Sequence, residues 1–269
     1  MHPILFEIRG FPVYTYGLLL AAAYLLGLQF ALVRARTRGL DPNRVMDLGI
    51  WIIVSALVGA KLLLLVVEFD KFGTNPAELL NLVRSGGVFY GGLIAAVVVA
   101  LWYLKRHRMP IWTVTDVFAP GIALGHVIGR LGCFFAGCCF GRPTNVPWAV
   151  TFHNEFAARN VGTPLGIPIH PTQVYEAGAE LLILILLLAT ERRGRPFPGR
   201  TFWGYMLLYG ISRFVIEFYR NDPRGMVGSF STSQFVSLLL VPLSLVMLFW
   251  LARRPGPAPA TGVRRARAA

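Results

Sequence analysis

Seven apolar runs of about the length needed to cross a bilayer recur along the chain. They lie at about residues 13–33, 48–67, 88–104, 114–136, 174–190, 201–219 and 234–252. A helix rises about 1.5 Å per residue, so roughly 20 apolar residues span the hydrocarbon core. Only 14% of the 269 residues are charged, and the mean hydropathy of +0.58 is too high for a soluble domain of this length. The sequence therefore predicts an all-α polytopic membrane protein with seven transmembrane helices.

The basic residues indicate how these helices are oriented. Most of the 26 Lys and Arg residues fall in alternate connections, near residues 34–44, 105–108, 192–200 and from 253 onward. Cytoplasmic loops of membrane proteins carry such an excess. We therefore expect the N-terminus outside and the C-terminus in the cytoplasm. The formal net charge of +13 is explained by this distribution, and no nucleic-acid partner is expected.

The connections suggest a single membrane domain with one external elaboration. We expect this domain over residues 1–253, followed by a disordered basic cytoplasmic tail over 254–269. The long connection at about 141–170 is expected outside as a small head loop, and connections of that length in compact folds are commonly functional. The chain begins without a basic n-region or a small-residue cleavage site, so no removable signal peptide is expected.

Three basic residues, Lys61, Arg130 and Arg213, lie inside the predicted spans. A charge at bilayer depth costs at least a few kcal/mol, so such residues usually face a protein interior or a wet cavity and mark a function. Counting along the helices places all three at similar depth, about 10 Å below the outer boundary. We therefore expect one anion site near the outer leaflet. Pairing of Arg130 with a buried carboxylate for packing alone is the alternative.

Residues near these cations extend the candidate site. Arg213 and Glu217 are four residues apart on a helix, so they share a face and can pair, either structurally or to hold the guanidinium flat against a phosphate. Glycines surround Arg130 at positions 121, 125, 129, 132, 137 and 141. We expect them to let helices approach closely and, at the last three positions, to let the backbone leave helical geometry.

Further polar residues gather at the predicted outer side. His170 precedes Pro171, which favours an extended backbone, and its imidazole is suited to act as a base near neutral pH. A hydrogen-bonded structural histidine is the more common alternative. Tyr16 and Tyr90 lie at the same side, and Glu176 is expected to point into the cavity.

The three cysteines, Cys133, Cys138 and Cys139, lie within seven residues. Together with His126 or His170 they offer a metal or redox site, but their spacing matches no recognised arrangement and small buried cysteines are common at helix interfaces. No metal or cofactor is therefore expected. A membrane thiol or metal protein built on these cysteines stays open as an alternative function, as does a lipid-binding, transporter-like protein, although no internal repeat is evident.

Several motifs occur in a fixed order along the chain. They are Tyr-Gly at 16–17, Gly-Gly-Leu at 91–93, Gly-Arg-Leu-Gly at 129–132, Gly-Arg at 141–142, His-Pro-Thr-Gln at 170–173 followed by Tyr175 and Glu176, Arg-Phe at 213–214 and Glu-Phe-Tyr-Arg at 217–220. With this ordered set the chain resembles the bacterial prolipoprotein diacylglyceryl transferase family over most of its length.

The resemblance implies a plasma-membrane enzyme with its site facing the outer leaflet. Such an enzyme moves the diacylglyceryl group of phosphatidylglycerol onto the lipobox cysteine thiol of a preprolipoprotein, forming a thioether and releasing glycerol phosphate. Arg130 and Arg213, aided by Lys61, would clamp the phosphate. His170 and Tyr16 are the candidates for removing the thiol proton, and Glu217 would orient Arg213. Other expected substrate contacts are Tyr90, Gly132, Gly137, Gly141, Gln173, Tyr175 and Glu176.

Four positions depart from the family's usual residues. Cys133 stands for an Asn, Cys138 for a Glu, Tyr90 for a His and Lys61 for an Arg. The first two changes remove an amide and a carboxylate beside the expected phosphate clamp. The chain is therefore expected to be a divergent member, in which headgroup or acceptor preference can differ.

Overall fold

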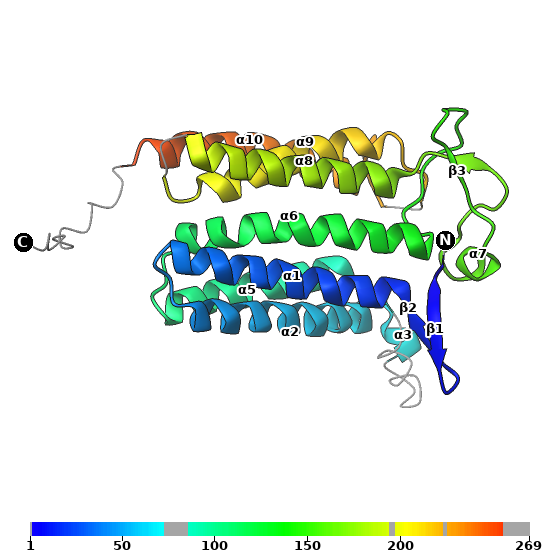
Figure 1. Cartoon of the computed structure of the whole chain (residues 1–269), viewed down its shortest axis with the longest axis horizontal. Coiled ribbons are helices and arrows are strands. Elements are labelled where there is room, and N and C mark those ends of the chain that lie inside the picture. Colours follow the sequence, from blue (N-terminus) through cyan, green and yellow to red (C-terminus); the bar gives the residue numbers. More distant parts are fainter. Residues whose placement is uncertain (1, 73–85, 194–196, 223–224, 255–269) are drawn as a thin grey trace, which may run out of the picture. The chain divides into compact units, whose positions relative to one another are not determined.

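The computed structural model describes residues 2–72, 86–193, 197–222 and 225–254, and these are mostly helical (Figure 1). Six helices are long and apolar enough to cross a membrane: α1 (Thr15–Thr37), α2 (Pro42–Val67), α5 (Phe89–Arg106), α6 (Ile111–Ala136), α8 (Thr172–Arg193) and α10 (Thr232–Ala252). The remaining predicted span falls on α9 (Arg200–Glu217), whose 18 residues include Arg200, Arg213 and Glu217. The helical prediction is confirmed, whereas the count of seven spans and their orientation stay predictions.

The chain divides into two compact units. One comprises residues 1–27 and 118–269, and the other comprises residues 28–117. The tail predicted over 254–269 lies outside the described residues, apart from Arg254.

In the smaller unit, α2 and α5 pack together through small residues. Asp41 caps α2 by accepting a hydrogen bond from the Asn43 amide, and Pro42 occupies the first helical turn. A Cβ placed on Gly59 would lie 2.5 Å from the carbonyl oxygen of Gly91, so only glycine permits this approach. The short helix α3 (Phe69–Phe72) follows α2.

In the larger unit, α6, α8 and α9 share an apolar core. Its buried members are Ala119, Ala123, Ile183, Leu184, Leu187 and Tyr205. Gly121 of α6 lies against Gly27 of α1, where a Cβ on Gly27 would be 2.8 Å from the Gly121 carbonyl oxygen. The predicted close approach is therefore confirmed at Gly121. It is wrong at Gly129, which has open space around it, and Gly132 stays inside α6 because the helix continues to Ala136.

Small hairpins flank the helices, and the sequence did not indicate them. The antiparallel pair β1 (Ile4–Ile8) and β2 (Phe11–Tyr14) leads into α1. The pair β5 (Met226–Val227) and β6 (Phe230–Ser231) leads into α10. Ser231 and Gln234 form a reciprocal capping box at the start of that helix, which satisfies two otherwise unpaired amides.

The segment predicted as a head loop is folded and has a core of its own. It contains β3 (Val150–Thr151), α7 (Glu155–Val161) and β4 (Pro168–Ile169), with β3 and β4 antiparallel. Phe140, Phe152 and Ile169 form its buried centre.

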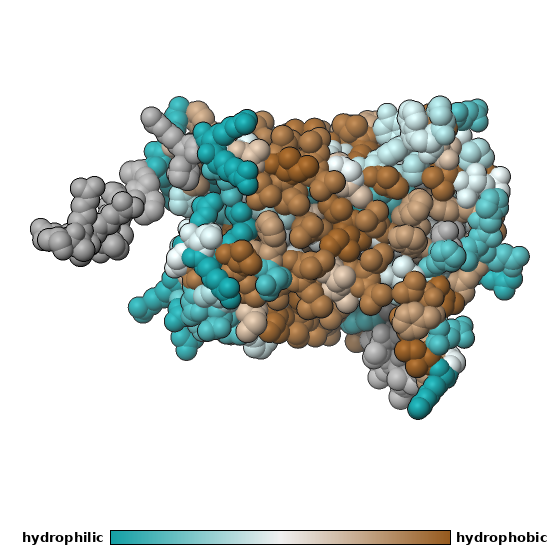
Figure 2. Space-filling view, in the orientation of Figure 1, coloured by the Kyte–Doolittle hydropathy of each residue, from teal (hydrophilic) through white to brown (hydrophobic). Residues whose placement is uncertain are grey.

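The helices expose apolar side chains along their length, as expected where lipid replaces water. Leu25 and Val66 are each 70% exposed, and Phe249 is 59% exposed. Figure 2 shows brown, apolar residues along the helices and teal, hydrophilic residues near their ends. Large apolar surfaces of this kind mark contact with a membrane or a partner.

Candidate functional site

One buried carboxylate, that of Glu176 near the start of α8, is shared by three arginines. Its Oε2 lies 2.5 Å from Nε of Arg130 on α6. Its Oε1 lies 3.0 Å from Nη1 of Arg213 on α9 and 2.6 Å from Nη1 of Arg220 just beyond α9. Glu176 is only 5% exposed, so these contacts offset the desolvation of its charge.

Two more carboxylates complete the cluster. Glu217 lies 2.6 Å from Nη2 of Arg213, so these residues pair as their spacing indicated. The same nitrogen donates to the Ser233 hydroxyl at 3.0 Å. Arg220 donates to both carboxylate oxygens of Asp222, from Nε at 2.9 Å and from Nη2 at 3.0 Å. Three guanidinium groups thus face three carboxylates.

The three arginines differ in how much of their donor capacity is already used. The side chains of Arg220 and Arg213 are 2% and 6% exposed, and each contacts two carboxylates. The side chain of Arg130 is 19% exposed, and within the described part of the chain its one ion pair is made through Nε. Arg130 therefore has no second carboxylate partner in the described part of the chain, unlike Arg213 and Arg220.

Arg220 is held in this cluster by the loop that follows α6. Gly141 forms a bridge with Arg220, and the Arg142 amide donates to the Tyr219 carbonyl at 2.8 Å. A Cβ on Gly141 would clash with the His170 backbone and lie 2.9 Å from the Tyr219 oxygen. Burial alone would lower the pKa of Arg220, but its hydrogen bonds to Asp222 and the charge of Glu176 raise that pKa above its ordinary value.

The His-Pro-Thr-Gln motif anchors the same loop by hydrogen bonds. The Gln173 amide nitrogen donates to the Cys138 carbonyl and the Thr172 hydroxyl to the Cys139 carbonyl, both at 2.7 Å. Thr163 donates to the Gly137 carbonyl at 2.9 Å. Gly137 has φ of +82°, a conformation that glycine adopts without strain. Gly137 and the fully buried Gln173 therefore shape the loop.

His170 lies in an aromatic group at the edge of this loop. Its Nδ1 is 3.1 Å from the Tyr175 hydroxyl, which also accepts a hydrogen bond from Trp148 Nε1 at 2.6 Å. The His170 ring packs edge to face against Tyr219, with centroids 5.1 Å apart. These contacts orient the imidazole through Nδ1 and through its ring face.

The remaining predicted site residues fall in different places. Tyr16, on α1, lies against α6, where a Cβ on Gly132 would be 3.3 Å from Tyr16 Cδ2. Lys61 and Tyr90 belong to the smaller unit, so their predicted position beside Arg130 stays a prediction.

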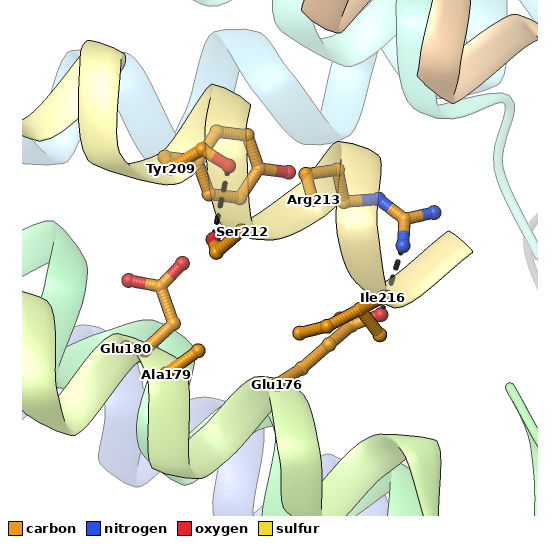
Figure 3. Close-up of a pocket in the computed structure, with 7 residues that line it drawn as sticks. All are labelled: Glu176, Ala179, Glu180, Tyr209, Ser212, Arg213 and Ile216. Atoms are coloured by element: carbon orange, nitrogen blue, oxygen red, sulfur yellow. Dashed lines mark hydrogen bonds and ion pairs between the residues drawn. The ribbon is translucent and has the colours of Figure 1, made fainter. Parts of the chain in front are cut away.

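A small pocket opens between α8 and α9 beside the cluster. Figure 3 shows Glu176 and Glu180 of α8 facing Tyr209 and Arg213 of α9 across it. Its cavity volume of about 10 Å³ is far below the roughly 300–1,000 Å³ usual for ligand pockets, so a lipid headgroup requires further opening. Glu180 also contacts His126 Nδ1 at 2.9 Å.

Sequence reasoning missed several members of this region. Arg220 entered only as the last residue of the Glu-Phe-Tyr-Arg motif, without a role in the site, and Asp222 was not considered. Arg220 lies three residues after Glu217 and so continues the helical face of Arg213 and Glu217, which was the available signal. The contact of His126 with Glu180 and with the Tyr205 hydroxyl, at 3.0 Å, had no comparable signal.

The fold and the site together define a helical membrane protein with a buried cluster of arginines and carboxylates. The family model described as prolipoprotein diacylglyceryl transferase matches residues 3–250. The chain belongs to this family of transferases, as its motifs indicated.

Curated relatives agree with the family match, and three of them are named phosphatidylglycerol-prolipoprotein diacylglyceryl transferase. The chain is 35% identical to the one from Clostridium tetani, over 91% of this chain and 96% of the relative. It is 36% identical to that from Gloeobacter violaceus, over 94% and 93% respectively. It is 33% identical to that from Synechococcus elongatus, over 93% and 87%.

Proposed function

We propose that this protein transfers the diacylglyceryl group of phosphatidylglycerol to the lipobox cysteine thiol of preprolipoproteins. A thioether forms and glycerol phosphate leaves. Family membership over residues 3–250 supports this activity, and the relatives carry it in their names. The structural observation behind the proposal is the pairing of Arg130 with the buried Glu176 through Nε, at a side chain that is still 19% exposed. The transporter-like alternative has no comparable support.

Arg130 is assigned to the phosphate of the lipid. A guanidinium has five N–H donors, and the four on its terminal nitrogens suit bidentate contact with phosphate oxygens. When the glyceryl C–O bond breaks, the phosphate gains negative charge as it leaves with the bonding electrons. A fixed cation stabilises that developing charge more than the ground state and thereby speeds the reaction.

Arg213 and Glu217 are assigned a positioning role that differs from a direct phosphate grip. Arg213 is almost fully buried and is occupied by Glu176, Glu217 and Ser233. It therefore acts on the lipid through Glu176, which in turn orients Arg130. Arg220 shares this role. Lys61 is proposed to add a further positive charge from α2.

His170 is assigned to accept the proton of the incoming thiol. Tyr175 holds Nδ1, so Nε2 is the atom that meets the substrate. Removing the proton is needed because a thiolate attacks carbon far faster than a thiol. Tyr16 is proposed to position the acceptor beside α6, and Tyr90, Gln173 and the three loop glycines are proposed to shape the substrate site.

We propose further that α9 is the seventh span. Its intramembrane charges are paired, since Arg213 and Glu217 are one turn apart, and pairing lowers the cost of insertion. Seven spans place the termini on opposite sides of the bacterial inner membrane. The excess of basic residues then puts the N-terminus, the folded head segment and the site at the outer leaflet, within one membrane domain over residues 1–253.

The test is a reconstituted assay with phosphatidylglycerol vesicles and a lipobox peptide. Thioether product is expected without added metal, and Arg130→Ala is expected to lower the rate by about 100-fold or more, as for other preorganised charge donors. Arg130→Lys should also lose most activity, because a point charge replaces a planar donor. Arg159→Ala is the matched control, since the Arg159 side chain is 78% exposed and, among the residues that the structure describes, pairs with Glu155 alone. Absence of product with every anionic phospholipid would overturn the assignment.

A further inference from the structure

The three cysteines converge on one point although the sequence separates them. Cys133 lies in the last turn of α6, and Cys138 and Cys139 lie in the loop that follows. All three are free thiols, and their Sγ atoms lie within 4.8 Å of one another. Cys133 is buried and the other two are partly exposed, so the cluster has an accessible side.

This spacing fits a metal ion bound by three sulfurs. A zinc–sulfur bond is about 2.3 Å long, so three sulfurs at tetrahedral positions around one ion lie about 3.8 Å apart. The cluster needs to contract only slightly to reach that geometry. A disulfide would join two of the sulfurs and leave the third thiol without a role. The mutual proximity of all three therefore favours a metal ion over a disulfide.

The loop is also held in place before any ion binds. Gln173 and Thr172 fix the carbonyl groups of Cys138 and Cys139. Cys139 has φ of +63°, a conformation that costs a residue with a side chain about 1–2 kcal/mol. Packing around the loop offsets that conformational free energy. Ligands held in advance bind more tightly, because less ordering accompanies binding.

The surrounding charges favour an anionic centre. A divalent ion with three thiolates carries a net charge of −1. Arg130 lies three residues before Cys133 on the same face of α6, and Arg220 bridges Gly141, two residues after Cys139, so both cations are placed near this charge. Soft thiolate ligands also select zinc and similar ions over magnesium or calcium.

We propose that Cys133, Cys138 and Cys139 form a three-thiolate site for one thiophilic divalent cation, with a water molecule as the fourth ligand. The site is additional to the proposed transferase activity, which does not depend on it. Its anionic centre lies beside Arg130, so an occupied site competes with the lipid phosphate for that guanidinium and raises the KM for phosphatidylglycerol.

The test is a titration of the reduced, detergent-purified full-length protein with CdCl2, followed by sulfur-to-cadmium charge-transfer absorption in the ultraviolet. We expect saturation at one Cd²⁺ per chain and competition by Zn²⁺ only when it is in large excess, because thiolates prefer the softer Cd²⁺. Cys133→Ala should weaken Cd²⁺ binding by at least about 100-fold, the scale of losing one of three ligands. His153→Ala is the matched control for binding at exposed histidines, and it should leave the titration unchanged.

Two further measurements keep the result decisive. Cys138→Ser and Cys139→Ser alter partly exposed residues, so each tests the site even if Cys133→Ala fails to fold. Loss of the absorption in both variants supports the site, and its persistence in both overturns it. Intact-mass analysis of unreduced protein that finds two hydrogens missing would also overturn it, because a disulfide would then occupy the cluster. Because binding is read without the transferase assay, failure of one proposal is distinguishable from failure of the other.

Discussion

Replacing Glu176 by glutamine tests the buried charge cluster most directly. The amide keeps nearly the same shape but removes the one negative charge that Arg130, Arg213 and Arg220 share. Arg213 keeps Glu217 and Arg220 keeps Asp222, so the variant leaves one buried positive charge without compensation. Removing one partner of a buried ion pair costs about 3–5 kcal/mol.

The expected result is a loss of that size in the free energy of unfolding. It is measured by denaturant unfolding of the purified protein in detergent, followed by tryptophan fluorescence. Glu155→Gln is the matched control, because Glu155 and Arg159 form an ion pair in which both side chains are more than 70% exposed. Exposed pairs contribute about 0–1 kcal/mol, so this variant should unfold almost as the original protein does.

The same variant should lose transferase activity for a separate reason. Without its carboxylate partner, Arg130 is no longer held through Nε, and its terminal nitrogens are no longer directed to the phosphate. Equal unfolding free energies for Glu176→Gln and Glu155→Gln would refute the reasoning. They would mean that water or lipid already screens the three arginines.

Two other substitutions test the loop and the histidine. Gly141→Ala should destabilise the protein by about 1–3 kcal/mol, because the added methyl group would clash with the His170 backbone. Gly129→Ala, in open space on a helix, should instead stabilise it by up to about 1 kcal/mol in the same unfolding assay. Equal effects of the two substitutions would contradict the close approach at Gly141. Tyr175→Phe removes the hydroxyl that orients the imidazole and that also accepts a hydrogen bond from Trp148. The free energy of unfolding should fall by about 1–3 kcal/mol for the two lost hydrogen bonds, and the transferase rate should fall by about 10-fold because the imidazole is no longer oriented. An unchanged rate would count against a role for His170.

The helices were predictable because their signal is local. Bilayer-length apolar runs indicated helices at all seven places, and the structure has a helix at each. The β1 and β2 hairpin was missed because its residues, such as Phe6 and Val13, are apolar and continue the composition of the following span. Hydropathy alone does not separate such a strand pair from the start of a helix.

The candidate site was only partly predictable. Charges inside apolar runs are conspicuous, so Arg130 and Arg213 were found, and the spacing of Arg213 and Glu217 indicated their pairing. Arg220 and Asp222 were missed because they lie beyond the end of α9, where charged residues are ordinary. Their place in the cluster depends on Gly141, which lies nearly eighty residues earlier in the chain.

Taken alone, the sequence determined that this chain forms apolar helices with a few buried cations, because each property depends on residues within one or two helical turns. The tertiary structure decided which cation is open to a ligand. Packing of α6 against α8 and α9 brings three arginines to one carboxylate, and the two that find a second carboxylate are fully occupied. Arg130 is left with donors to spare because no second carboxylate among the described residues lies within ion-pairing distance of it.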